Sequence, residues 1–330
     1  MDIFTQGLLG GALAQSCADK ELRAATTVGF VAGLLPDADT LIRSTSDPLL
    51  FLQFHRHFTH SLVFVPIGAA IAAVLLWPLF RRRLRVVELY GFALLGYALA
   101  GLLDACTSYG THLLWPFTDQ PVAWNIISIV DPLFSLVLLV GVVVGYWLRR
   151  SQPVRLALLV AGCYLAFAAW QHERVEDAAR ALAESRGHAP RQLMVKPTIG
   201  NIILWRSLYV HERILYADGI HQGLTGAPIV YQGVSRPLLT LDSLSGSEKG
   251  AFRPRDLYRF AQFSDQLLVR HPHRSLFIGD ARFAMLPTSL RPLWGIEPGV
   301  DASAGAVFVA DRELGPDERA RFVRMLTGRL

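Results

Sequence analysis

The sequence has little charge for a chain of 330 residues. Only 18% of its residues are Asp, Glu, Lys or Arg, whereas 52% are of hydrophobic type, and its mean hydropathy is +0.33. A soluble enzyme of this length usually carries more charge, so the composition argues against an ordinary soluble protein. Charge is scarce before about Trp170 and crowded after it. This asymmetry predicts a membrane domain over residues 1–170 and a soluble domain over residues 171–330.

Cysteine is also scarce. Cys17, Cys106 and Cys163 lie in or beside apolar segments, and the polar half of the sequence has none. A disulfide framework therefore does not hold the polar half together. The sequence lacks repeats and low-complexity tracts, and it does not open with a basic segment and a small-residue cleavage site. We therefore expect no cleaved signal peptide.

The net charge of +5 would suit a nucleic-acid-binding protein, but two arginine clusters lie between apolar runs. These clusters, Arg81–Arg85 and Arg149–Arg155, are typical of loops on the cytoplasmic side of a membrane. We therefore interpret them as topology signals and expect no nucleic-acid partner.

Four apolar runs approach or exceed the roughly 20 residues that a membrane span needs. They are Ser61–Phe80, Val86–Cys106, Ile126–Trp147 and the somewhat short Val154–Trp170. Two shorter runs, Ile3–Cys17 and Ala24–Leu35, form either a re-entrant hairpin or tilted, protein-buried helices. Their glycines and alanines would allow close helix packing. The expected fold is a membrane all-α helical bundle of about four full spans plus two short N-terminal helices, followed by a small α+β extracytoplasmic domain.

In the soluble half, β-rich segments bounded by turn residues predict strands, for example over Gln192–Pro197 and Asn201–Val210. Helical spacing of apolar residues predicts helices over Pro254–Arg270 and Pro316–Leu326. If the basic loops are cytoplasmic, alternation of the four spans places this domain outside the membrane. The same alternation brings six candidate ligands to the outer face: Asp37, Asp39, His55, His60, Asp104 and Asp131.

The aspartates lie at the ends of apolar runs, where an acid must be protonated, paired or bound to a cation. For Asp37 and Asp39, the alternative to a metal site is a turn of solvated acids after Pro36. For Asp131, the alternative is an acid favoured by the helix dipole at a helix start. Asp104 lies near the C-terminal end of its run, where the dipole disfavours an acid and a cation would offset that effect.

Three histidines lie in the segment FHRHFTHSLVFV, at the N-terminal end of the first full span. Imidazole and carboxylate together suit zinc, manganese or iron. We prefer His55 and His60 as ligands over His57. Arg56 would either bind a phosphate oxygen bidentately or anchor the chain at the interface. Thr59 is either the N-cap of the following helix or a hydrogen-bond donor to a ligand.

Motifs in the first 150 residues resemble those of the bacterial membrane-bound metal-dependent hydrolases, a group that includes a LexA-regulated inner-membrane protein. The motifs are LPDADT, HRxxTHS, LLDACTSYGTHLLWPF and IVDPLFSL, in that order. The resemblance implies a multi-pass protein of the bacterial inner membrane. It also implies metal ligands at the six positions named above, whereas a fixed histidine at position 57 is not part of the family pattern.

We therefore expect a metal-dependent hydrolase that holds one or two divalent ions, most favourably zinc or manganese. The metal would activate a water molecule, and Arg56 and Thr59 would assist, Arg56 by steadying negative charge in the transition state. A site at the level of the lipid headgroups favours a phosphoester or ester of an amphiphilic, lipid-like substrate within the bilayer. The alternatives are a transporter or ion-pathway protein, and a non-catalytic envelope protein with a structural metal.

Overall fold

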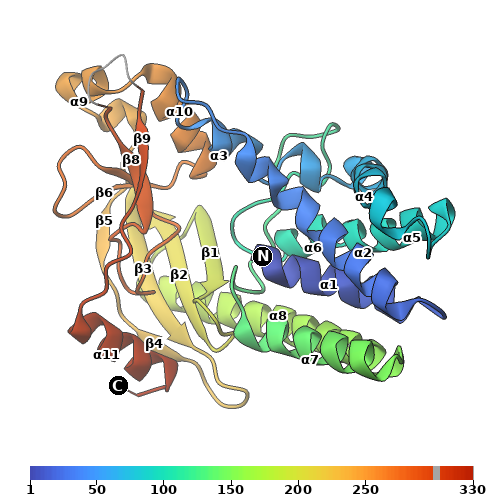
Figure 1. The fold of residues 1–330 in the computed structure, drawn as a ribbon. Helices are drawn as coiled ribbons and strands as arrows, with labels where there is room; N and C mark the ends of the chain where they lie inside the picture. The colour runs from blue at the N-terminus through green and yellow to red at the C-terminus, as the bar shows by residue number, and fades with distance from the viewer. Residues whose placement is uncertain (300–304, 330) are drawn as a thin grey trace. The chain divides into compact units, whose positions relative to one another are not determined.

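The computed structural model describes residues 1–299 and 305–329. Its chain divides into two compact units (Figure 1). The helical unit comprises Met1–Leu41, Phe54–Trp170 and Ile199–Ile202, and the sheet unit comprises Ile42–Gln53, Gln171–Thr198 and Ile203–Leu330. The boundary at Trp170 falls inside the long helix α8 (Gln152–Ser185), so this helix contributes residues to both units.

The helical unit is built from apolar helices, with a long loop over residues 106–131 between the sixth and seventh α-helices of the chain. Its elements are α1 (Ile3–Ser16), α2 (Leu22–Leu34), the 3-10 turns η1 (Leu35–Leu41), η2 (Phe58–His60) and η3 (Leu62–Phe64), α4 (Val65–Phe80), α5 (Val86–Ala98), α6 (Ala100–Ala105), α7 (Pro132–Leu148) and the first part of α8. The short helix α3 (Leu50–Phe54) precedes η2. Among residues 1–299 and 305–329, three segments are long and apolar enough to cross a membrane, namely Leu62–Phe80, Val86–Ala105 and Gln152–Ser185.

The third predicted span is shorter than expected. The apolar run Ile126–Trp147 becomes helical only at Pro132, and α7 has 17 residues. The side chain of Asp131 accepts a hydrogen bond from the backbone N–H of Phe134 at 3.0 Å. This N-cap and the proline after it start the helix six residues later than the apolar pattern suggests.

Glycines let three helices of this unit approach closely. Gly10 of α1, Gly29 of α2 and Gly96 of α5 meet at one crossing, where a Cβ on Gly10 would lie 2.5 Å from the Gly29 carbonyl oxygen and 2.7 Å from that of Gly96. Real side chains do not fit at such separations, so glycine is required there. The close packing expected from the small residues of the N-terminal runs is present.

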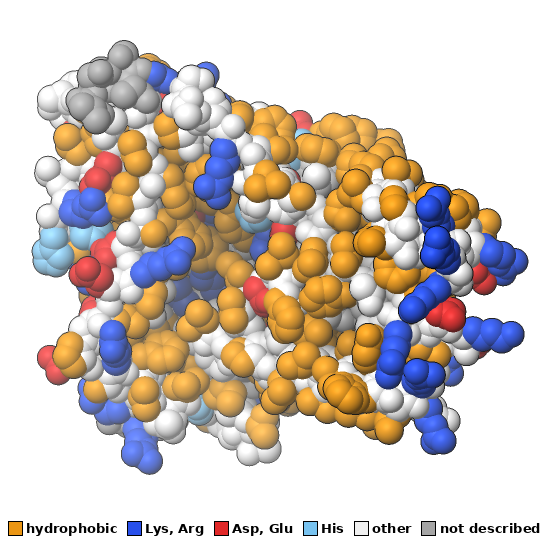
Figure 2. All heavy atoms as spheres, in the orientation of Figure 1, with side chains coloured by type: hydrophobic (Ala, Val, Ile, Leu, Met, Phe, Trp, Pro, Cys, Tyr) orange, Lys and Arg blue, Asp and Glu red, His pale blue; other side chains and the backbone are white. Residues whose placement is uncertain are grey.

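The helices of this unit alternate between two chemically different ends. Arg81 follows the end of α4 and Arg149 follows the end of α7, whereas His60 precedes α4 and Asp104 lies at the end of α6. Figure 2 shows Lys and Arg side chains gathered at the end of the helical unit where Figure 1 places the α4–α5 and α7–α8 connections. The outward side of α4 is apolar, with Val74 72% exposed. Such a surface is suited to lipid.

The sheet unit contains two antiparallel sheets. In the first, the order is β1 (Gln192–Pro197), β2 (Leu204–His211), β3 (Ile214–His221) and β4 (Ile229–Tyr231), with β5 (Ser235–Pro237) also paired to β3. In the second, the order is β6 (Leu268–Arg270), β7 (Ile278–Asp280), β8 (Trp294–Glu297) and β9 (Val307–Ala310). Around them lie η4 (Leu241–Ser243), α9 (Gly246–Ala251), α10 (Pro254–Phe263) and α11 (Pro316–Leu326). This is a small α+β arrangement.

One helix of this unit is shorter than its sequence pattern suggests. The prediction of a helix over Pro254–Arg270 was wrong beyond Phe263, because Asp265 and Gln266 adopt positive φ angles of 55° and 61°. Left-handed residues end an α-helix. The chain then forms the strand β6 instead.

Candidate metal centre

Asp37 and Asp39 lie in the 3-10 turn η1, directly after α2. Pro36 has no backbone N–H to donate to the carbonyl four residues earlier, and the α-helical pattern ends there. The two aspartates are 7% and 2% exposed, so they are not the solvated acids of a surface turn. Asp39 Oδ2 accepts hydrogen bonds from the backbone N–H of Arg56 at 2.8 Å and from Thr59 Oγ1 at 2.9 Å.

The histidine segment folds back onto these aspartates. Arg56 has a φ of 59°, and this left-handed residue turns the chain. His55 Nδ1 then lies 2.9 Å from Asp39 Oδ1. The turn η2 carries His60 into the interior, where it is 2% exposed. Gly101 of α6 makes room for it, because a Cβ at this position would collide with the carbonyl oxygen of His60.

Asp104 is fully buried in the last turn of α6. Its Oδ2 lies 3.1 Å from Nε of Arg56, and its Oδ1 contacts the α-amino group of Met1. Arg56 also donates from Nη1 to Thr107 Oγ1 at 2.8 Å, and Thr107 Oγ1 lies 2.7 Å from the carbonyl oxygen of Asp104. The guanidinium of Arg56 therefore ties the histidine segment to the end of α6.

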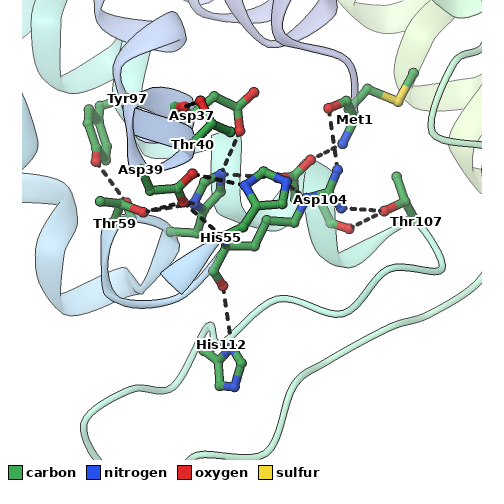
Figure 3. A network of polar contacts seen from close by, with 12 residues as sticks. Met1, Asp37, Asp39, Thr40, His55, Thr59, Tyr97, Asp104, Thr107 and His112 are labelled. Carbon is green, nitrogen blue, oxygen red and sulfur yellow. Dashed lines mark hydrogen bonds and ion pairs between the residues drawn. The ribbon is translucent and has the colours of Figure 1, made fainter. Parts of the chain in front are cut away.

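Three ligand atoms from these segments converge. His60 Nε2 lies 3.3 Å from Asp37 Oδ1 and 3.1 Å from Asp104 Oδ2. All three atoms are buried, and within the described residues none has a hydrogen-bond partner. Figure 3 shows the side chains of Asp37 and Asp104 directed toward a common space. Buried polar atoms normally have hydrogen-bond partners. Three such atoms that lack partners and face one another indicate that a cation binds between them.

The spacing of these atoms fits a divalent cation. Ligands about 2.1 Å from one metal ion stand about 3.0–3.4 Å apart in octahedral or tetrahedral geometry. The distances of 3.1 and 3.3 Å around His60 Nε2 match this range. Asp37, His60 and Asp104 form a group that could hold a metal ion.

A second group shares Asp37 and adds Asp39 and His55. One ligand atom from each residue lies within 4.8 Å of the others. The His55 side chain is 20% exposed, whereas the side chains of His60 and Asp104 have no exposed area. The second group is therefore the open side of the site, and the first group is its closed side.

Thr59 orients the imidazole of His60. Its hydroxyl donates to Asp39 Oδ2, so its oxygen lone pair faces His60 Nδ1 at 3.0 Å. This favours the proton of a neutral imidazole on Nδ1 and leaves Nε2 free as a ligand atom. A carboxylate or hydroxyl that fixes the far nitrogen of a histidine is a regular feature of metal sites.

The pKa values show how strongly these groups interact. Burial acts to lower the pKa of His60, but its contacts with Asp104, Asp37 and Asp39 raise that pKa to about 10. Burial likewise acts to raise the pKa of Asp39, but hydrogen bonds from His55 and His60 hold it well below its usual range. Both shifts show a negatively charged pocket that stabilises positive charge.

Two other sequence candidates lie outside both groups. Asp131 caps α7, and its Oδ2 accepts a hydrogen bond from the hydroxyl of Tyr164 at 2.8 Å. The ring of His57 packs against that of His112, with centroids 4.5 Å apart. Figure 3 shows His112 well apart from the aspartates. The structure thus brings together five of the six predicted ligands and places Asp131 in a capping position.

Sequence reasoning missed two neighbours of the site. Thr107 receives the hydrogen bond from Arg56. The ring of Tyr109 lies 5.0 Å from the Arg56 guanidinium carbon and 5.2 Å from the ring of His55. Both residues stand in the CTSYG stretch that directly follows Asp104. Their place in that motif was the available signal, and hydroxyl or aromatic character alone did not distinguish them.

Comparison with known proteins places the chain in a family. The family model described as YdjM inner membrane protein matches residues 1–175. The uncharacterized protein YfhP of Bacillus subtilis (strain 168) is 26% identical over 210 residues, which cover 60% of this chain and 63% of that protein. The chain thus spans less than two thirds of the length of this relative. No solved structure matches the chain.

The family match covers more than half of the chain and includes the whole metal centre. It agrees with the apolar helices, which indicate a membrane protein, and it confirms the resemblance carried by the motifs around Asp37, His60 and Asp104. The chain belongs to the YdjM inner membrane protein family.

Proposed function

We propose that the protein is a membrane-bound metal-dependent hydrolase whose metal ion is held by Asp37, His60 and Asp104. The observation that supports this most directly is the convergence of three buried ligand atoms, none of which has a hydrogen-bond partner in the described part of the chain. One imidazole and two carboxylates suit zinc or manganese better than softer metals.

A bound divalent ion would supply Lewis acidity and lower the pKa of a coordinated water toward about 7. Neighbouring residues hold the ligand side chains in position. Thr59 and Asp39 hold the imidazole of His60 in orientation, and Arg56 holds the carboxylate of Asp104. Arg56 is 3% exposed, and its guanidinium contacts both Asp104 and Thr107. It therefore acts mainly as a positioning residue and contributes positive charge to the pocket.

Apolar side chains beside the site support an amphiphilic substrate. Leu62 and Val63, just after the histidine segment, are 43% and 44% exposed, and Leu114 and Phe117 are 48% and 83% exposed. The backbone N–H of Leu62 donates to the carbonyl of Leu113 at 2.9 Å, which joins these two apolar segments. A lipid-like phosphoester or ester could present its head group to the ligands while its chain lies along these side chains.

We place the metal centre at the outer face of the bacterial inner membrane, in a multi-pass protein whose sheet unit is extracytoplasmic. The support is the arginine-rich connections at the opposite end of the helical unit, which favour the cytoplasm. The bilayer is then both the solvent of the helices and the source of substrate.

A non-catalytic protein with a structural metal is the second candidate. It is favoured by the complete burial of His60 and Asp104, because structural metal sites are closed and catalytic sites keep an open position. Activity measurements separate the two candidates.

The first experiment measures bound metal in the full chain, purified in detergent, by mass spectrometry. The variants are Asp37→Ala and His60→Ala, and the control is Glu88→Gln, whose carboxylate pairs with the exposed Arg85. We expect the wild type and the control to carry zinc or manganese, and each of the two site variants to lose at least half of it. Equal metal content in all four proteins would contradict the proposal.

The second experiment follows hydrolysis of fluorogenic phosphodiester and carboxylester lipid analogues by the metal-loaded protein. Turnover that disappears in His60→Ala supports the hydrolase. Metal binding without turnover of either analogue would favour the structural-metal candidate instead.

A further inference from the structure

The two groups of potential ligands share one residue. Asp37 belongs both to the closed group with His60 and Asp104 and to the open group with Asp39 and His55. Asp37 is 7% exposed, and its buried Oδ1 has no hydrogen-bond partner within the described residues. A carboxylate has two oxygens and can ligate two cations at once.

We propose that the centre binds two divalent cations bridged by Asp37: an inner ion held with His60 and Asp104, and an outer ion held with Asp39 and His55. This inference rests on the metal site of the proposed function and adds a second ion to it.

Geometry supports the pair. Two-metal sites in hydrolases hold their ions about 3.5–4 Å apart. Within each group the ligand atoms lie within 4.8 Å of one another. The 2.9 Å hydrogen bond between His55 Nδ1 and Asp39 Oδ1 keeps the two ligands of the outer ion next to each other. Because Asp39 also accepts hydrogen bonds from Arg56 and Thr59, its carboxylate is held in place before a metal ion binds.

The two positions differ in exposure, and this assigns them different roles. The side chains of His60 and Asp104 have no exposed area, so the inner ion is enclosed by protein. The His55 side chain is 20% exposed, so the outer ion keeps positions open for water and substrate. The inner ion is therefore the tighter one, and the outer ion is the one that meets the substrate.

The number of ions also bears on substrate class. The guanidinium of Arg56 offsets the charge of Asp104, and one divalent ion balances the charges of Asp37 and Asp39. Two divalent ions outweigh these carboxylates and attract an anionic group. The two-ion centre therefore takes a phosphoester in preference to an uncharged carboxylic ester.

The test uses Mn²⁺ as the probe in the full-length, chelator-stripped protein in detergent. Bound ions are counted by titration, and the spectrum of the bound ions is recorded by electron paramagnetic resonance. We expect two Mn²⁺ per chain with the spectrum of a spin-coupled pair. His55→Ala, a change at a partly exposed side chain, should bind one Mn²⁺ with the six-line spectrum of an isolated ion, and so should the conservative variant His55→Gln.

The bridge itself is tested by Asp37→Asn, which should lose both ions and not just one. A wild type that binds one uncoupled Mn²⁺, lost in His60→Ala but kept in His55→Ala, would overturn the two-ion centre and leave the proposed single-ion hydrolase intact. A wild type that binds no Mn²⁺ and no Zn²⁺ would overturn both. Two ions that stay uncoupled in the wild type would overturn the bridging role of Asp37.

Discussion

Acidic side chains of low exposure have different partners in the two units of this molecule. In the sheet unit, Asp218 accepts two hydrogen bonds from Arg186 at 2.7 and 2.9 Å, and Asp311 accepts two from Arg291 at 2.7 Å each. In the helical unit, Asp37 Oδ1 and Asp104 Oδ2 lie 3.3 and 3.1 Å from His60 Nε2, and neither oxygen has a hydrogen-bond partner among the described residues. Both candidate metal groups among the described residues lie in the helical unit.

The comparison shows that burial of an acid does not by itself mark a functional site. A carboxylate whose two oxygens both accept hydrogen bonds from one guanidinium is part of the scaffold. Asp104 also has a guanidinium nearby, with Arg56 Nε 3.1 Å from its Oδ2, but Asp37 Oδ1 and Asp104 Oδ2 have no hydrogen-bond partner among the described residues. Unsatisfied ligand atoms beside one imidazole suit a cation. The following experiments test this distinction in each unit.

The largest effect is expected in the sheet unit from Asp280→Asn. Asp280 is fully buried and accepts hydrogen bonds from the backbone and side chain of Arg282 at 2.9–3.2 Å. Breaking a buried pair leaves a guanidinium without its counterion, which costs about 3–5 kcal/mol. Thermal unfolding in detergent measures the loss. Because the acid is structural, metal content should not change. A loss of bound metal would contradict a purely structural role of Asp280.

Metal removal should destabilise the helical unit. A ligand that binds only the folded state at a concentration one hundred times its Kd stabilises it by about 2.7 kcal/mol. A chelator should therefore lower the unfolding temperature of the wild type and of Asp280→Asn, but not that of His60→Ala. If neither chelator nor added zinc changes the unfolding temperature of the wild type, the helical unit does not bind a stabilising metal.

Gly101→Ala should disturb the centre through packing alone. A Cβ at this position would collide with the carbonyl oxygen of His60, and overpacking of this kind costs about 1–3 kcal/mol. We expect weaker metal binding together with lower thermal stability. Gly91→Ala in α5 is the matched control, because a Cβ there meets no atom within 4 Å. Equal metal affinity in the two variants would show that the position of His60 does not depend on this contact.

The smallest effect concerns the pH dependence of the sheet unit. The hydrogen bond from Arg291 is the main reason that the pKa of Asp311 is lowered to about 2. A lowered pKa in the folded state stabilises the fold above the ordinary aspartate pKa of about 3.9, and this contribution is lost as the pH falls through about 2. For a pair at the edge of the unit we expect about 1 kcal/mol at most.

Asp311→Asn should therefore be less stable than the wild type at pH 7, and the difference should shrink as the pH falls from 4 to 2. Thermal unfolding across this pH range measures it. A difference that stays constant down to pH 2 would assign the effect to something other than the carboxylate charge.

The sequence predicted the centre better than its surroundings. Acids beside apolar runs are rare, so Asp37 and Asp104 stood out as candidates by position, although a turn of solvated acids stayed open for Asp37. The helix Pro316–Leu326 was also predictable, because Pro316 and the two acids after it form a regular helix start. In contrast, Asp131 had the same position relative to an apolar run, and only the structure shows its carboxylate turned to Tyr164.

The remaining differences have a common physical origin. The strands β5, β6 and β8 have three or four residues, which is too few to show the alternation of a half-buried strand. The roles of Thr107 and Tyr109 depend on contacts with Arg56, a residue about 50 positions earlier. Sequence periodicity reports on local structure, and such distant pairings become visible only once the chain is folded.

The most direct test of the metal centre is X-ray absorption spectroscopy at the zinc edge, on the full chain loaded with one equivalent of zinc. We expect nitrogen and oxygen ligands at about 2.0–2.2 Å, with the multiple-scattering signal of an imidazole that disappears in His60→Gln. A zinc shell that lacks this imidazole signal in the wild type, or that is unchanged in His60→Gln, would contradict it.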